Sequence, residues 1–146
     1  MATQTATAQS AIEQAKLSVI AYNDKNWEAC KQALTSDAVY DEIATHRRLE
    51  GVDAIISAWK AWATALPDSK ATFENAFASD EKVVLEMRWR GTHGGPLTLP
   101  GGSIDPTGRA IDIRACQIIE LKNGKTRAIR HYFDVATMLQ QLGINK

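Results

Sequence analysis

The sequence has little of what marks several large classes of protein. Lys and Arg together number 17, as do Asp and Glu, so there is no basic surface for nucleic acid or an anionic membrane. The apolar runs fall far short of the roughly 20 residues that a membrane-spanning helix needs. Residues 1–10 lack the positive segment and apolar core of a signal peptide. These absences favour a cytoplasmic protein that binds neither nucleic acid nor membrane.

Cysteine and histidine are also scarce, and this excludes several kinds of site. The two cysteines, Cys30 and Cys116, stand far apart, and in a chain without export signals we expect them to be reduced. The three histidines, at positions 46, 93 and 131, lack the HxH, HxxxH and HExxH spacings, so we expect no metal site. The phosphate-binding glycine loops and the GxSxG nucleophile motif are missing too. What remains is acid–base chemistry without a cofactor, or binding alone.

The order of hydrophobic patterns predicts an α+β fold in one domain that spans residues 1–146. Apolar residues recur at helical spacing in three early segments, the first of which begins with a Ser10–Glu13 capping box after a disordered tail at 1–9. Alternating patterns follow, and a short helix ends at Gly143. The predicted helices cover 10–23, 27–34, 52–66 and 135–142, and the predicted strands cover 39–43, 71–78, 83–93, 111–120 and 129–133. Since the helices precede the strands, we expect an antiparallel sheet with helices packed on it.

Local signals add detail to this sheet. Asn123-Gly124 is the strongest hairpin signal of the chain, and Ser36-Asp37 predicts a turn before the first strand. Phe73 and Phe77 are expected to share one face of their strand. Residues 94–108, rich in Gly and Pro, are expected to form a loop, and Gly101-Gly102 within Pro100–Pro106 resembles a mobile cover for a pocket.

Three polar residues, His93, Gln117 and His131, share strand faces with apolar neighbours. Buried polar groups cost free energy unless they are paired, so this pattern predicts a cavity with polar groups in an apolar wall. The tryptophans available for that wall are Trp59, Trp62 and Trp89. Each histidine also has a simpler interpretation as a hydrogen-bonded residue of the core.

The segment that carries most chemistry is Arg130–Gly143, where His131 and Asp134 stand three residues apart at the end of an apolar strand. A histidine with an ordinary pKa of about 6.5 can accept a proton near neutral pH. Asp134 has two interpretations: it orients His131, or it caps the helix that follows. Residues three apart point to opposite faces of a regular strand, so the first role requires the strand to bend.

Several segments, taken in order, resemble one known family. They are Arg90-Gly91-Thr92-His93-Gly94, Pro106-Thr107-Gly108-Arg109, Lys122-Asn123-Gly124-Lys125, Arg130-His131-Tyr132-Phe133-Asp134 and the closing Leu139-Gln140-Gln141-Leu142-Gly143. From Ala21 to Gly143 the chain is similar to the SnoaL-like polyketide cyclases, or ester cyclases, of the nuclear transport factor 2-like superfamily. The resemblance implies a cone-shaped, curved antiparallel sheet, N-terminal helices over a deep apolar pocket, and a homodimer. It also implies an intramolecular aldol closure without a cofactor.

The chain departs from this family at the residue that matters most. The catalytic carboxylate of the characterised cyclases corresponds to His131, and the related limonene epoxide hydrolases also carry Asp there. His46 and His93 match other histidines of the cyclases, whereas Gln117 replaces a third. The resemblance therefore transfers the fold, while the reaction needs its own argument.

We therefore predict cyclase or isomerase chemistry on an apolar small molecule that bears a carbonyl group. His131 would be base and acid, Asp134 its partner, and His93 and Gln117 would hold the substrate oxygen. The other predicted substrate contacts are Trp59, Trp89, Phe133, Tyr40 and His46. The alternative is a non-catalytic binding or carrier protein that uses the same pocket.

Overall fold

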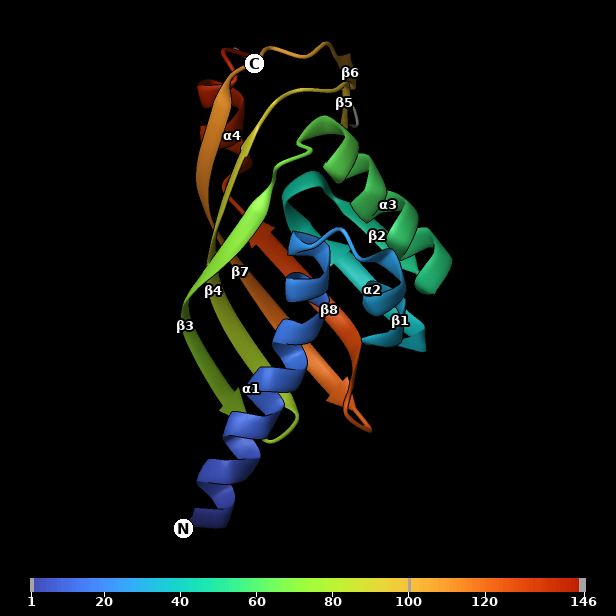
Figure 1. The fold of residues 1–146 in the computed structure, drawn as a ribbon, viewed down its shortest axis with the longest axis vertical. Helices are drawn as coiled ribbons and strands as arrows, with labels where there is room; N and C mark the ends of the chain where they lie inside the picture. The colour runs from blue at the N-terminus through green and yellow to red at the C-terminus, as the bar shows by residue number, and fades with distance from the viewer. Residues whose placement is uncertain (1, 100, 145–146) are drawn as a thin grey trace.

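The structure, a computed structural model, describes residues 2–99 and 101–144. In this part of the chain, helices pack against a strongly curved six-stranded sheet with strand order β2-β1-β8-β7-β4-β3 (Figure 1). The elements are α1 (Ala2–Asn23), α2 (Trp27–Gln32), β1 (Leu34–Glu42), η1 (Ile43–Thr45), β2 (Arg47–Glu50), α3 (Val52–Ala65), β3 (Lys70–Ser79), β4 (Lys82–Thr92), β5 (Leu97–Leu99), β6 (Gly102–Ile104), β7 (Ala110–Lys122), β8 (Lys125–Phe133) and α4 (Val135–Gln141). The α+β prediction is confirmed.

The first helix is longer than predicted. It begins at Ala2, so the predicted helix start at Ser10 is wrong for the described residues. The hydroxyl of Ser10 lies within the helix and accepts a hydrogen bond from Gln14 Nε2 at 3.4 Å. Residues 2–9 contain no Gly or Pro, so nothing in their chemistry stops the helix. None of the described helices combines the length and apolar character needed to cross a membrane.

The first strand is also longer than predicted, and it makes the sheet mixed. β1 includes Ser36 and Asp37, where we expected a turn, and the turn signal appears instead as a register irregularity between Leu34 and Val39. β1 pairs with β8 in parallel and with β2 in antiparallel orientation. Since β1 and β8 lie almost at opposite ends of the chain, no hairpin fixes their relative direction.

A bulge in β3 separates two phenylalanines that we expected on one face. The register between β3 and β4 shifts between Phe73 and Asn75, and an extra residue in a strand exchanges the faces beyond it. Phe73 consequently packs against the core, whereas Phe77 is 58% exposed. β4, which carries Val83, Leu85 and Met87, pairs with β7 without such a shift, and these three side chains are fully buried.

The segment from Gly94 to Gly108, predicted to be a loop, contains regular structure. Its described residues include the β5–β6 hairpin, and Leu97 is 2% exposed. The N–H groups of Gly94 and Gly95 donate to the carbonyl of Ala65, at 3.0 and 3.1 Å, and so close the C-terminal end of α3.

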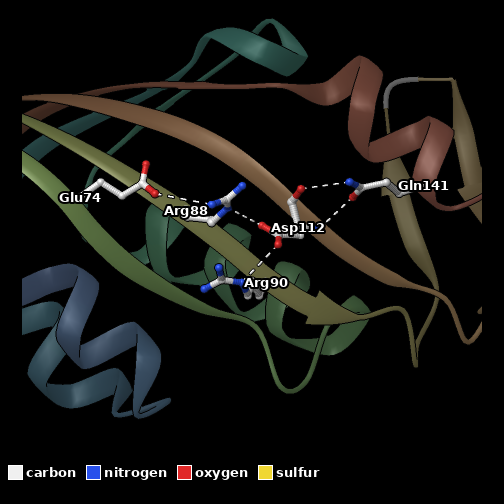
Figure 2. A network of polar contacts seen from close by, with 5 residues as sticks. All are labelled: Glu74, Arg88, Arg90, Asp112 and Gln141. Carbon is white, nitrogen blue, oxygen red and sulfur yellow. Dashed lines mark hydrogen bonds and ion pairs between the residues drawn. The ribbon is translucent and has the colours of Figure 1, made fainter.

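A polar network ties the terminal helix α4 to β7 (Figure 2). Gln141 pairs with the backbone of Asp112, accepting from its N–H at 2.8 Å and donating to its carbonyl at 3.0 Å. The carboxylate of Asp112 in turn accepts from Arg88 and Arg90, at 2.6 and 3.3 Å. The network positions α4 so that Met138 faces inward.

Candidate functional site

The inner face of the sheet, α1, α3 and α4 enclose an apolar pocket between two groups of core side chains. The pocket has a volume of about 70 Å³ and is partly open to solvent. It is lined by Ser18, Val19, Tyr22, Tyr40, Glu42, Trp59, Trp62, Leu66, Ser69, Trp89, Ile111, Ile113, Gln117, His131, Phe133 and Met138. The residues proposed from the sequence that line it are Tyr40, Trp59, Trp62, Trp89, Gln117, His131 and Phe133.

His131 lies at the centre of a hydrogen-bonded chain inside this pocket. Its Nε2 atom accepts from the indole N–H of Trp89 at 3.3 Å, and its Nδ1 atom lies 2.8 Å from the hydroxyl oxygen of Tyr40. An indole N–H can only donate, so a neutral His131 carries its proton on Nδ1 and donates it to Tyr40. Tyr40 donates its own proton to Glu42 at 2.9 Å. The chain therefore runs from Trp89 through His131 and Tyr40 to a carboxylate.

Glu42, the end of this chain, is fully buried and was missed by the sequence analysis. Four donors converge on it: Tyr40 and Trp62 Nε1 reach one oxygen, each at 2.9 Å, and Thr45 and Arg47 reach the other. The Nη2 atom of Arg47 lies 3.2 Å away and supplies the opposite charge. A buried carboxylate needs this number of partners to be stable.

The local chain path explains how these donors meet. Tyr40 and Glu42 are two residues apart in β1, so both side chains face the pocket. The strand then ends in η1, where His46 adopts a left-handed conformation with φ of 58°. This turn brings Thr45 and Arg47 back to Glu42. The signal that could have identified Glu42 is its alternation with Tyr40 in a predicted strand.

Burial shifts the pKa of two side chains in this hydrogen-bonded chain, His131 and Tyr40. Desolvation of the ring lowers the pKa of His131 to about 4, although the charge of Glu42 opposes this effect. Desolvation, together with the Glu42 charge, raises the pKa of Tyr40 well above its ordinary value. Both side chains are thus neutral near pH 7, as the hydrogen-bond directions require.

Asp134 does not contact His131. It is the N-cap of α4, where its two oxygens accept from the N–H and the hydroxyl of Thr137 at 3.0 and 2.6 Å. These hydrogen bonds lower the pKa of Asp134. The capping interpretation describes its position, and Tyr40 occupies the place beside His131 that we expected Asp134 to take.

The other two histidines lie outside the residues that line the pocket. His93 is fully buried, and its Nδ1 atom contacts the hydroxyl and N–H of Thr107 at 3.1 and 3.2 Å, so it ties the ends of the 94–108 segment together. His46 is exposed and ends η1. Both were predicted to bind substrate because they match histidines of the resembling family, and His93 also because it shares a strand face with apolar residues. Neither signal fixes which part of the interior a side chain reaches.

Two polar atoms in the pocket wall have no hydrogen-bond partner among the described residues: Gln117 Oε1 and Ser18 Oγ. Cys30 is buried and Cys116 is half-buried, and neither forms a disulfide. Within residues 2–99 and 101–144, no three His, Cys, Asp or Glu side chains group closely enough to hold a metal ion. The site therefore consists of one bonded polar chain, two free polar atoms and an aromatic wall.

Comparisons with known proteins agree with this architecture. The sequence model of the SnoaL-like polyketide cyclase family matches residues 13–142, and no curated protein matches the chain. A structure from Jannaschia sp. CCS1, assigned to the SnoaL-like polyketide cyclases, superposes with a TM-score of 0.84 at 16% identity, covering 96% of each chain.

Two further structures share the fold and are described differently. A protein of ketosteroid isomerase-like fold from Catenulispora acidiphila gives a TM-score of 0.77 at 15% identity, covering 91% of this chain and 94% of that one. An epoxide hydrolase of M. tuberculosis, described as LEH-like, gives 0.71 at 18% identity, covering 92% and 90%. Identities this low show a common fold, and one fold can carry several reactions.

Proposed function

The chain belongs to the SnoaL-like polyketide cyclase family, and from this premise we propose that it is a cofactor-independent enzyme of cyclase or isomerase type. Its substrate would be an apolar small molecule that bears a carbonyl group. The observation that carries the proposal is the hydrogen-bonded chain from Trp89 through His131 and Tyr40 to Glu42, inside an apolar pocket. Within these hydrogen-bonded residues, His131 is the catalytic base, and Tyr40 and Glu42 relay the proton.

The proposed step moves one proton along the chain. His131 Nε2 takes a proton from the carbon beside the substrate carbonyl, and the electron pair of the broken C–H bond forms an enolate. Nδ1 passes its proton to Tyr40 as Tyr40 passes its own to Glu42. The enolate then attacks a second carbonyl carbon in a cyclase, or takes a proton on another carbon in an isomerase. The same relay, run in reverse, returns the proton.

The relay explains how the site could act with a histidine, His131, at the position where the characterised cyclases have their catalytic carboxylate. A buried His131 with a pKa of about 4 holds an extra proton poorly, so storing it on the imidazole alone is unfavourable. Passing the proton to Glu42 leaves neutral His131 and a neutral carboxylic acid. The hydrogen bond from Trp89 to Nε2 is long at 3.3 Å, so a substrate oxygen can take over this donor and be stabilised as negative charge develops.

The test is enzyme-dependent exchange of deuterium into 2-tetralone, an apolar ketone with acidic protons beside its carbonyl, followed by mass spectrometry in D₂O. We expect the wild type to accelerate exchange, and His131→Gln and Tyr40→Phe to reduce the acceleration by about 100-fold. Glu50→Gln, on an exposed residue of β2, is the control and should exchange as the wild type does. Wild-type exchange no faster than in buffer, or full activity of His131→Gln, would reject the proposal.

The second candidate is a non-catalytic binding or carrier protein with the same pocket. It is favoured by one observation: both ring nitrogens of His131 already have partners, Trp89 and Tyr40. Saturable binding of 2-tetralone without any deuterium incorporation over long incubation would favour this candidate.

We also propose that the protein is a homodimer formed through the outer face of the sheet. Tyr132 is 40% exposed and alternates with the inward-facing His131, so it points outward. Phe77 pairs with Val84, between the buried Val83 and Leu85, and is also exposed on this face. Large exposed apolar side chains on one surface are typical of protein–protein contacts.

A further inference from the structure

Gln117 and Ser18 differ from the other polar residues of the pocket because their buried atoms are unpaired. Gln117 is 4% exposed and Ser18 is 1% exposed. Among the described residues, neither Gln117 Oε1 nor Ser18 Oγ has a hydrogen-bond partner, whereas His131, Tyr40 and Glu42 are all bonded. A buried polar group without a partner costs free energy, because it has lost its hydrogen bonds to water. Two such groups in the wall of one pocket point to a ligand that completes them.

We infer that Gln117 and Ser18 form a second polar subsite, which binds a hydroxyl group of the ligand in the pocket that the proposed function uses. The hydroxyl proton is donated to Gln117 Oε1. The hydroxyl oxygen accepts from the Ser18 hydroxyl or from the amide N–H of Gln117, since both side chains can donate as well as accept. The ligand is therefore a hydroxylated carbonyl compound with an otherwise apolar body.

Strand register fixes where this hydroxyl lies relative to the reacting carbon. Gln117 is the direct neighbour of His131 across the β7–β8 pairing, and of Leu85 across the β4–β7 pairing. Adjacent strands are about 4.8 Å apart, so the side chains of Gln117 and His131 start side by side on the inner face. A ligand that binds to both Gln117 and His131 must carry its hydroxyl only a few bonds from the carbon that His131 deprotonates.

Ser18 approaches the pocket from α1, one helical turn before Tyr22. The Tyr22 ring meets Trp89 edge-on with centroids 5.3 Å apart, which holds this part of α1 against the sheet. The pocket volume of about 70 Å³ is well below the roughly 300–1,000 Å³ of pockets for drug-sized ligands. The enclosed part of the ligand is consequently small, such as one ring with its hydroxyl, and any larger portion extends towards solvent.

A matched pair of fluorinated probes tests this subsite without turnover. 4-Fluorophenol and 4-fluorotoluene have similar shapes, and only the first has a hydroxyl group. Each probe is titrated into the wild type and followed by ¹⁹F NMR. The dissociation constant of 4-fluorophenol should be about fivefold lower than that of 4-fluorotoluene, because one ordinary hydrogen bond provides a difference of this size. The ratio of the two dissociation constants should fall to about one in Gln117→Met, which keeps the side-chain size. In Ser18→Ala the preference for 4-fluorophenol should weaken.

The control is Thr126→Val. Thr126 Oγ1 is also buried and unpartnered, but Thr126 does not line the pocket, so this variant should keep the wild-type preference. Equal affinity for both probes, no saturable binding of 4-fluorophenol, or an unchanged preference in Gln117→Met would overturn the inference. So would a crystal structure with water on Gln117 and the probe hydroxyl elsewhere.

The two proposals can fail independently, because one is tested by binding and the other by exchange. A Gln117-dependent preference in a protein that exchanges no deuterium supports the subsite and rejects the enzyme. His131-dependent exchange without a hydroxyl preference rejects only the subsite.

Discussion

At the scale of single residues, the unusual feature is a neutral histidine that shares a hydrogen-bonded chain with a buried carboxylate. Burial of the ring lowers the pKa of His131, and the charge of Glu42 opposes this effect. The Tyr40 hydroxyl lies between the two groups and donates to Glu42 at 2.9 Å, and Arg47 supplies the charge that balances the carboxylate. His131 therefore stays neutral because it is buried, while Tyr40 links it to a group that can take its proton.

This arrangement predicts a specific pH dependence of stability. The pKa of His131 is about 4 in the folded protein and about 6.5 in an unfolded chain, so between these values only the unfolded state binds the proton. The contribution to stability is complete above about pH 6.5 and is lost as the pH falls towards 4. Between pH 7.5 and pH 5 the expected loss is about 2 kcal/mol of unfolding free energy.

Urea denaturation at the two pH values measures this loss. In His131→Gln, the loss of unfolding free energy that is due to residue 131 should disappear. His46→Gln changes an exposed histidine and should lose as much stability between the two pH values as the wild type does. An equal pH difference in the wild type and His131→Gln would contradict the argument.

At the scale of elements, the end of α3 depends on a close approach by the segment that follows β4. A Cβ atom on Gly95 would lie 2.1 Å from the carbonyl oxygen of Thr64, inside any allowed contact distance. The same approach lets Gly94 and Gly95 donate to Ala65. The segment and the helix end are thus fitted to each other, and Leu66 of the pocket wall follows directly.

Gly95→Ala should therefore lower the free energy of unfolding by about 2 kcal/mol, since the backbone must shift and the helix-closing hydrogen bonds weaken. Gly101→Ala is the matched control, because its added Cβ would meet nothing within 4 Å. Thermal unfolding of both variants checks this, and equal melting temperatures for the two would contradict it.

At the scale of the whole molecule, the outer face of the sheet determines how the chain assembles in the proposed dimer. Sedimentation equilibrium should give a mass twice the 16.0 kDa of the chain. Tyr132→Glu should shift this to the monomer mass, because it adds a desolvated charge at the interface. Leu17→Glu, an equivalent change at an exposed apolar residue of α1, should remain dimeric. A monomeric wild type, or a dimeric Tyr132→Glu, would count against this interface.

Much of the fold and part of the site could be predicted from local patterns. Strict alternation in β4 and β7 identified the inward-facing side chains, including Gln117, and the Asn123-Gly124 turn connects β7 and β8 as predicted. These features depend on period and turn chemistry, which neighbouring residues determine. The reversal of faces in β3 was missed, because a bulge depends on the fit between two strands.

The sequence by itself determined the α+β class, through the order of its hydrophobic patterns, and the resemblance to the family, through motifs taken in order. Short-range periodicity predicted that His131 shares a strand face with apolar residues, whereas its direction into the pocket came from the structure. Only the tertiary structure decided the partners of His131. Tyr40 and Glu42 come from β1, which joins β8 by a parallel pairing between distant parts of the chain. Trp62, which donates to Glu42, comes from α3. Tyr40, Thr45 and Arg47 lie within five residues of Glu42, whereas Trp62 and His131 do not. Because no common spacing links these distant residues, only packing shows that the buried carboxylate has four donors and is joined to His131 through Tyr40.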